Sequence, residues 1–404
     1  MNKKRILAKL HKNRWLIALS ASGIHISIGS VYAWSVLAIP IMLQTGWSLP
    51  NVTFAFSLAI FFLGLSAGTF GSYVEKYGAT KTGLASTAFY CIGLIGTALA
   101  LSIQNIYLLY LFYGVIGGIG LGLGYVTPVS TLVKYFPENR GFATGLAIMS
   151  FGFASLISAP LMQYLVTTYN LTANFLILGL AYAVIMIISS LYLSPPKNYK
   201  ESNEDVQSSY TPKEAYATWQ FKALWISFFI NITCGIALLS IVSPMAQDVI
   251  GMTAERAAGL VGIVGLVNGV GRIFWSTLSD YVGRGYTYIA FFAMEIILFG
   301  MLAVFTNEFI FSLAIMIIIS CYGGGFSCMP AYLSDLFGNA HLSTIHGRVL
   351  TAWGFAGLVG PLMISVGKSM LGSYNLILYV FVALFVLNLL IAITLKTHED
   401  LVEN

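Results

Sequence analysis

The segment GLVNGVGRIFWSTLSD (residues 265–280) contains an arginine, Arg272, in a run of glycine and apolar residues. The apolar run extends from residue 257 to residue 278, which is long enough to cross a hydrocarbon layer of about 30 Å as a helix. An arginine near the centre of such a helix costs about 3 kcal/mol, so arginines at such positions face a polar cavity or a partner. The segment therefore predicts a membrane-spanning helix with a polar environment around Arg272.

The rest of the chain has the same apolar character. Of its 404 residues, 58% are hydrophobic and 9% are charged, too few polar side chains to cover a soluble globule of this size. Apolar runs of about 20 residues, the length of a membrane-spanning helix, recur along the chain. We predict twelve spans, at residues 15–42, 52–74, 83–102, 107–131, 143–166, 173–194, 222–247, 257–278, 287–305, 309–332, 349–370 and 376–395.

One polar stretch separates the first six predicted spans from the last six. Its sequence, SPPKNYKESNEDVQSSYTPKEAYATWQ (194–220), is charged and contains proline, and it is too hydrophilic for a hydrocarbon environment. We therefore expect a six-helix domain in residues 1–194, a cytoplasmic linker in 195–220 and a second six-helix domain in 221–404.

The two halves contain similar segments. GSYVEKYGATK (71–81) matches STLSDYVGRGY (276–286), and GFASLISAPLM (152–162) matches GFAGLVGPLM (354–363) with one gap. Both pairs are separated by about half the chain length. Such repeats predict duplicated six-helix bundles, the arrangement of carriers whose binding site lies between the two repeats.

Basic residues are distributed unevenly between the predicted loops. With the N-terminus inside, seventeen of the twenty Lys and Arg residues fall in cytoplasmic segments, so the positive-inside rule places both termini in the cytoplasm. The basic segment 1–15 leads into the first span without a small-residue cleavage site, so we expect no removed signal peptide. The net charge of +5 then reflects topology and not nucleic-acid binding. We expect a monomer in the lipid bilayer of a bacterial inner membrane.

The segment 71–81 fits the pattern G-x-x-x-[DE]-[RK]-x-G-x-x-[KR], and it resembles the signature loop between helices 2 and 3 of the major facilitator superfamily. The segment 276–286 is similar to a degenerate second copy of that loop. Within the superfamily, the region around Arg272 and the segment RVLTAWGFAGLVGP (348–361) resemble the oxalate:formate antiporter family and its monocarboxylate-carrying relatives. The resemblance implies an all-α membrane protein with twelve transmembrane helices in two pseudo-symmetric six-helix bundles.

Two acidic residues occupy matching positions at the ends of predicted spans 2 and 8. Glu75 lies near Lys81, and Asp280 lies near Arg284. An acidic side chain at such a position interacts with helix ends and basic groups of neighbouring helices. These interactions must break when the two bundles rotate relative to each other. We predict that these four residues take part in gating; the alternative is that the acids are solvated loop carboxylates.

Arg272 lies about 12 Å from the cytoplasmic end of its predicted span, deeper than a side chain normally snorkels. Its planar guanidinium can hold a carboxylate through two parallel hydrogen bonds, so we predict a small carboxylate anion as the ligand. Asn268, one turn earlier, would bind an oxygen next to that carboxylate. Gly265 and Gly269 either make room for the anion or allow close helix packing. A structural alternative for Arg272 is a buried ion pair with Glu295.

The resemblance implies that three tyrosines contribute hydroxyl groups to the site: Tyr32, Tyr125 and Tyr322, in helices 1, 4 and 10. For Tyr32, packing is an equal alternative. Oxalate-carrying members have a lysine at the position of Trp353 in LTAWGFAG (350–357). With Arg272 as the one predicted deep cation, a second carboxylate would stay unpaired. A monocarboxylate such as lactate, pyruvate or formate therefore fits better than oxalate, with Trp353 as an apolar wall.

Moving a monoanion inward against a negative-inside potential costs about 2.3 kcal/mol per 100 mV, which one co-transported proton cancels. His25, in SGIHISIGS (22–30), is one candidate proton carrier, although a hydrogen-bonded packing role is the alternative. Glu295 is a second candidate. Some proton-coupled relatives have an aspartate where this chain has Asn268, so such an Asp/Arg pair is not available here.

The sequence therefore predicts a secondary active transporter of small monocarboxylates that works by alternating access and proton symport. The alternatives are an anion exchanger of the oxalate/formate type and a carboxylate sensor that does not transport. The sequence shows no paired deep acids, no nucleophile and base constellation, and no metal-ligand spacing. We expect no enzymatic activity, no cofactor and no bound metal.

Overall fold

The computed structural model describes residues 13–132, 135, 140–194, 210–338 and 341–403. Every regular element in these ranges is a helix, and twelve helical spans are long and apolar enough to cross a membrane. The chain is therefore an all-α membrane protein, as predicted. Each predicted span coincides with one of the twelve, although several helices continue beyond the predicted ends.

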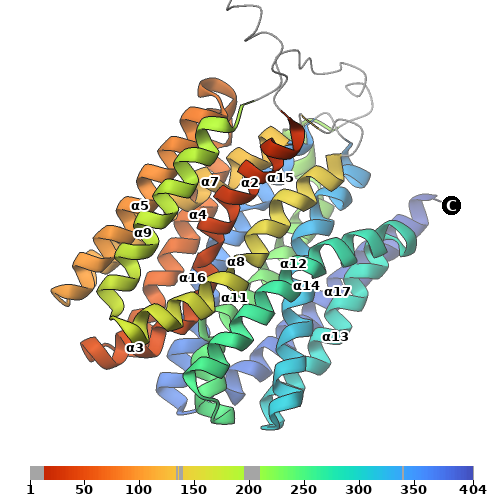
Figure 1. Cartoon of the computed structure of the whole chain (residues 1–404). Coiled ribbons are helices and arrows are strands. Elements are labelled where there is room, and N and C mark those ends of the chain that lie inside the picture. Colours follow the sequence, from red (N-terminus) through yellow and green to blue (C-terminus); the bar gives the residue numbers. More distant parts are fainter. Residues whose placement is uncertain (1–12, 133–134, 136–139, 195–209, 339–340, 404) are drawn as a thin grey trace, which may run out of the picture.

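The first six spans form one bundle, and two of them are interrupted (Figure 1). A 3-10 turn at Ser30–Ala33 divides span 1, and a π-helical segment at Tyr110–Gly117 divides span 4. The helices are α2 (Arg14–Gly29) with α3 (Ser35–Thr45), α4 (Leu49–Tyr77), α5 (Ala79–Ser102), α6 (Ile106–Leu109) with α7 (Gly118–Leu132), α8 (Arg140–Thr168) and α9 (Leu171–Tyr192).

The last six spans form the second bundle, beside the first in Figure 1. A short helix, α10 (Pro212–Ala217), precedes them within the predicted linker, and a capping box between Thr211 and Glu214 fixes its start. The helices are α11 (Trp219–Met245), α12 (Ala254–Val282), α13 (Arg284–Val304), α14 (Glu308–Phe337), α15 (Leu342–Val349) with α16 (Thr351–Leu371), and α17 (Asn375–Glu403).

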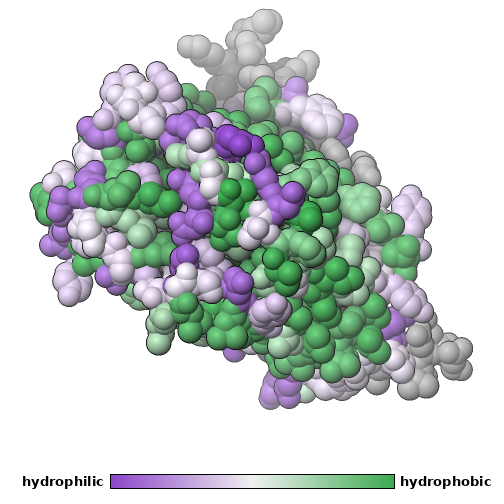
Figure 2. All heavy atoms as spheres, turned by 90° about the horizontal axis from the view of Figure 1, so that it is seen from below, coloured by the Kyte–Doolittle hydropathy of each residue, from purple (hydrophilic) through white to green (hydrophobic). Residues whose placement is uncertain are grey.

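The helix ends define two faces of the molecule. We call the end where α2 begins and α10 lies the linker face, at the top of Figure 1, and the opposite end the far face. On the far face, side chains of asparagine or threonine cap the first turns of α6, α9, α12 and α14. Figure 2 looks onto the far face, where hydrophilic residues gather near the middle. Large apolar side chains such as Leu180 and Leu390 are instead exposed on the flanks, where lipid would cover them.

The predicted repeat appears in the backbone at Gly78 and Gly283. Each glycine ends a helix of 29 residues, α4 or α12, and starts the next one. Gly78 has φ 85° and ψ 155°, and Gly283 has φ 90° and ψ 151°. A residue with a Cβ atom rarely adopts this positive φ. The same special conformation at two aligned positions reflects the pseudo-symmetry of the two bundles.

The two bundles touch near both faces and at the centre. Toward the linker face, α4 packs on α16 so closely that a Cβ atom on Gly64 would lie 2.5 Å from the Cα atom of Gly354. Toward the far face, α3 packs against α11.

At the centre, a Cβ atom on Gly265 of α12 would lie 1.8 Å from the Oγ atom of Ser155 of α8. A Cβ atom on Gly269 would lie 2.6 Å from the ring of Phe153 in α8. Gly265 and Gly269 therefore serve close helix packing.

Candidate functional site

Arg272 lies in the middle of α12, where the two bundles meet, and only 1% of its surface is exposed. Its Nε atom donates to Oδ1 of Asn268 over 3.4 Å, and its Nη1 atom donates to the carbonyl oxygen of Ile148 in α8 over 3.5 Å. The ring of Phe326 covers it, with its centroid 5.2 Å from the guanidinium carbon. Both hydrogen bonds are long and neither acceptor is charged, so these contacts hold the side chain without neutralising it.

No ion pair involves Arg272 within the described part of the chain. The ion pairs found there all lie near the two faces: Arg256–Glu308, Arg284–Asp280, Arg284–Asp335 and Lys368–Asp248. Glu295 is fully buried in α13, and it takes part in none of these ion pairs. The alternative of a buried Arg272–Glu295 pair therefore does not occur in this structure.

Three tyrosines lie close enough to Arg272 for its charge to act on their hydroxyls: Tyr32, Tyr125 and Tyr322. Tyr32 comes from the 3-10 turn of span 1, Tyr125 from α7 and Tyr322 from α14. The hydroxyls of Tyr32 and Tyr322 are hydrogen-bonded to each other at 2.8 Å, so this bond, like that from Arg272 to Ile148, links the two bundles. The structure thus brings together the three tyrosines that the resemblance implied.

Aromatic rings enclose this polar group. Trp353 is fully buried in α16, and its ring centroid lies 5.2 Å from Tyr125, 4.8 Å from Phe326 and 6.3 Å from Phe151. Phe151 also packs edge-on against Tyr32 at 4.9 Å. Phe151 and Phe326 were missed in the sequence analysis, because a phenylalanine inside an apolar helix has no distinguishing pattern.

Two more buried donors of this region have no acceptor within the described residues. They are the indole Nε1–H of Trp353 and the side-chain amide nitrogen of Asn268. An unpaired buried donor costs about 1–3 kcal/mol, and a fixed cation without a counter-charge costs more. Unpaired donors beside a cation without an acidic partner are therefore complementary to a small anion in charge and in hydrogen bonding.

His25 lies beside this cluster, fully buried between α7 and α8. Its Nδ1 atom faces the carbonyl oxygen of Ala147, and its Nε2 atom lies 3.1 Å from the carbonyl oxygen of Tyr125. A neutral imidazole has one N–H and can donate to only one of these acceptors, whereas the protonated ring can donate to both. The neighbouring carbonyl in α8, that of Ile148, accepts from Arg272. The His25 and Arg272 side chains are therefore tied to consecutive peptide groups of one helix.

The predicted gating residues lie at the linker face. Arg284 bonds to Asp280 at 2.5 Å and to Asp335 of α14 at 3.2 Å, so this cluster joins three helices of the second bundle. Asp335 was missed, although SDLFG (334–338) repeats the SDYVG pattern of 279–283. Lys81 is exposed at the start of α5. The side chain of Glu75 lies outside the described part of the chain.

Comparisons with known proteins agree with this architecture. The sequence profile of the Major Facilitator Superfamily matches residues 19–361. The chain is 28% identical to an uncharacterized MFS-type transporter, YhjX, of Escherichia coli K12 over 86% of both chains. It is 26% identical to the oxalate:formate antiporter of Oxalobacter formigenes, over 86% of this chain and 83% of that one. It is 22% identical to the apicoplast pyruvate carrier 1 of Toxoplasma gondii, over 90% of this chain and 86% of that one.

Solved structures give the same fold. A bacterial homolog of the human lysosomal transporter Spinster, in an inward-facing and occupied conformation, superposes with a TM-score of 0.71. The match covers 95% of this chain and 96% of the other, at 14% sequence identity. At this identity the likeness concerns the fold alone.

Proposed function

The chain belongs to the Major Facilitator Superfamily, and we propose from this premise that it transports small monocarboxylate anions of the lactate, pyruvate or formate type across its membrane. The observation that carries the proposal is the buried guanidinium of Arg272, which has no acidic partner among the described residues and lies among tyrosine, indole and amide donors. A planar cation of this kind binds a carboxylate through two parallel hydrogen bonds.

The balance of charge favours one carboxylate per anion. Arg272 supplies one positive charge, and the walls formed by Trp353, Phe151 and Phe326 are aromatic. A second carboxylate would have to be desolvated against these rings without a counter-charge of its own, because both ring nitrogens of His25 face backbone carbonyl oxygens. The oxalate:formate antiporter and the pyruvate carrier among the relatives are named for small carboxylates, in keeping with this substrate class.

The contacts between the bundles support alternating access. The site lies between the α4–α16 contact toward the linker face and the α3–α11 contact toward the far face. Release to one side requires that the contact on that side separates, which rocking of the two bundles achieves. By the distribution of basic residues, we place the linker face and both termini in the cytoplasm of a bacterial cell. In this scheme Glu75, Lys81, Asp280 and Arg284 modulate the linker-face gate.

We further propose proton symport with His25 as the proton carrier. Protonated His25 and Arg272 are both cations, so they repel each other, and a carboxylate bound at Arg272 offsets this repulsion. Binding of the anion and binding of the proton therefore favour each other. Glu295 is the second candidate, because a buried carboxyl group without a hydrogen-bond partner among the described residues suits a neutral, protonated state. Exchange of anions is the alternative that the oxalate:formate antiporter supports.

The proposal is tested by uptake of labelled lactate, pyruvate, formate and oxalate into proteoliposomes, with and without an inward proton gradient. We expect monocarboxylate uptake that the gradient accelerates, and little uptake of oxalate. Oxalate uptake that depends on internal formate and ignores the gradient would replace symport by exchange. Binding of monocarboxylates without any flux would show a sensor and overturn the carrier function.

Replacing Trp353 with lysine should change the selectivity of the site. Trp353 and Arg272 both contact the ring of Phe326, so a second cation at position 353 would pair with the second carboxylate of oxalate, and a charge-assisted hydrogen bond contributes about 1.5–3 kcal/mol. We expect the ratio of oxalate to lactate affinity to rise about tenfold or more, measured by competition against a labelled monocarboxylate. Trp353→Phe is the matched control, because it keeps the aromatic wall and adds no charge. An unchanged ratio in Trp353→Lys would contradict the proposed substrate argument.

A further inference from the structure

A hollow with a volume of about 780 Å³ opens on the side of the molecule between the two bundles, near the linker face. On one side it is lined by Phe61 and Leu65 of α4, in the first bundle. On the other side it is lined by α10, the start of α11, and α15 with α16, in the second bundle. Because it lies on the flank, away from Arg272, it belongs to neither the candidate site nor the proposed gate cluster.

The end of the hollow next to the linker face is basic. Lys222 and Arg348 line it, both with exposed side chains, and none of its described lining residues is acidic. Neither cation takes part in an ion pair within the described ranges. Arg348 rests over the ring of Tyr216, with 5.9 Å from the guanidinium carbon to the ring centroid. Two positive charges are thus available to one ligand.

The deeper part of the hollow is apolar. Trp225 lies three positions after Lys222, stacks on Phe229 at 5.6 Å, and donates from its indole N–H to the hydroxyl of Thr351. Leu65 and Phe355 are 45% and 50% exposed in the hollow, so apolar surface is available to a ligand below the charges.

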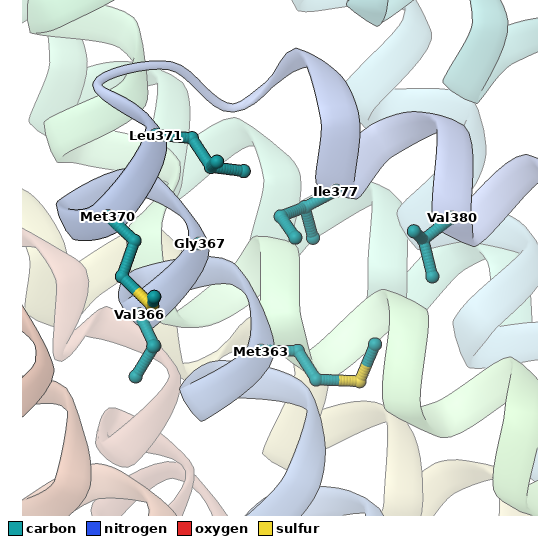
Figure 3. A pocket seen from close by; sticks show the side chains of 7 residues that line it. All are labelled: Met363, Val366, Gly367, Met370, Leu371, Ile377 and Val380. Atoms are coloured by element: carbon teal, nitrogen blue, oxygen red, sulfur yellow. The ribbon is translucent and has the colours of Figure 1, made fainter.

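A second hollow offers a useful contrast. Figure 3 shows it between α16 and α17, lined by seven residues from Met363 to Val380, with a volume of about 330 Å³. None of these lining residues carries a charge. Such a surface suits any acyl chain equally and selects no particular lipid, whereas the hollow at Arg348 combines charge with apolar depth.

We propose that the hollow at Lys222 and Arg348 binds an anionic phospholipid from the leaflet at the linker face. The phosphate would pair with the two cations, and the acyl chains would lie along Trp225, Leu65 and Phe355. Basic pockets between membrane helices bind anionic headgroups in this way, and lysine and arginine reach such headgroups from helix ends. The apolar walls open toward the bilayer, so they suit a lipid and not a soluble anion.

Such a lipid would also act on the linker-face gate, a consequence that rests on the proposed alternating access. The hollow is built from both bundles, and its α4 and α16 walls meet where Gly64 contacts Gly354. Opening of the linker face separates α4 from α16 and divides the hollow. The lipid therefore stabilises the state that is closed at the linker face, because it binds this state better than the open one.

Binding is tested by fluorescence quenching in phosphatidylcholine vesicles that contain a minor, fixed fraction of phosphatidylglycerol. Bromine atoms are placed on the acyl chains of either lipid. The Trp225 signal is the difference in fluorescence between the wild-type protein and Trp225→Phe. We expect brominated phosphatidylglycerol to quench this signal with about tenfold stronger association than brominated phosphatidylcholine. The double variant Lys222→Gln/Arg348→Gln should lose this preference, and Lys213→Gln, which removes an exposed cation of α10 outside the hollow, should keep it.

Equal quenching by the two lipids would overturn the proposal, as would displacement of brominated phosphatidylglycerol by soluble glycerol phosphate. The Arg272→Lys protein must show the same lipid preference, so failure of the lipid site and failure of the transport function can be told apart. For the gate, the cysteine of Ile60→Cys, at a fully buried position of α4 that packs against Gly357 of α16, should react with a soluble maleimide about tenfold more slowly in vesicles containing phosphatidylglycerol. An unchanged labelling rate would overturn the effect on the gate.

Discussion

Monocarboxylate uptake is expected to fall about ten- to a hundredfold when Arg272 is replaced by lysine. Lysine keeps the positive charge but loses the planar fork that holds both oxygens of a carboxylate. Each charge-assisted hydrogen bond lost contributes about 1.5–3 kcal/mol, and tenfold in affinity corresponds to about 1.4 kcal/mol.

The measurement is initial uptake of labelled lactate or pyruvate into proteoliposomes with equal amounts of inserted protein. Arg256→Lys is the matched control, because Arg256 lies in the same helix but is exposed and paired with Glu308 near the far face. We expect the control to transport at the wild-type rate. Wild-type uptake by Arg272→Lys would show that the guanidinium does not hold the substrate.

His25→Gln is expected to abolish accumulation driven by a proton gradient while leaving anion exchange intact. Glutamine is similar in size and its amide can still donate to one of the two carbonyl oxygens that face His25, those of Ala147 and Tyr125. It cannot take up a proton, so the gradient no longer drives net uptake. Exchange of one labelled anion for another requires no net movement of protons and should continue.

The test compares uptake under an inward proton gradient with counterflow at equal pH. Uptake by His25→Gln should fall to the level measured without a gradient, and counterflow should stay within about twofold of wild type. His341→Gln serves as the control, because this histidine lies at the start of α15 on the linker face. Acid-stimulated uptake that survives in His25→Gln would exclude His25, and loss of it in Glu295→Gln would then assign the proton to the buried acid.

The parts of the site that were predicted from the sequence are those that violate the apolar pattern. Arg272 is conspicuous because a charge inside a membrane-spanning segment is rare, and Gly78 and Gly283 are conspicuous because the repeat aligns them. Phe151 and Phe326 line the same site but look like any other apolar residue of their helices. Their role depends on which helices face each other, and this information is absent from a single helix pattern.

The glycines of α12 illustrate the same limit. From the sequence, Gly265 and Gly269 suited either a substrate pocket or helix packing. Only the position of α8 decides between them, because Ser155 and Phe153 fill the space beside these glycines. Likewise, the bond between Arg284 and Asp335 connects residues of α13 and α14 that are 51 positions apart. The choice of partner in such pairs is a property of the tertiary packing.

The hydrogen bond between Tyr32 and Tyr322 has a consequence for the direction of the transport cycle. In the proposed cycle, this bond gives one phenol hydrogen an acceptor in the other bundle when no substrate is present, so it lowers the free-energy cost of closing the empty protein. A carrier that changes conformation without bound substrate can carry out net transport of the substrate down its gradient. A protein that could reorient only when loaded would be restricted to swapping one molecule for another.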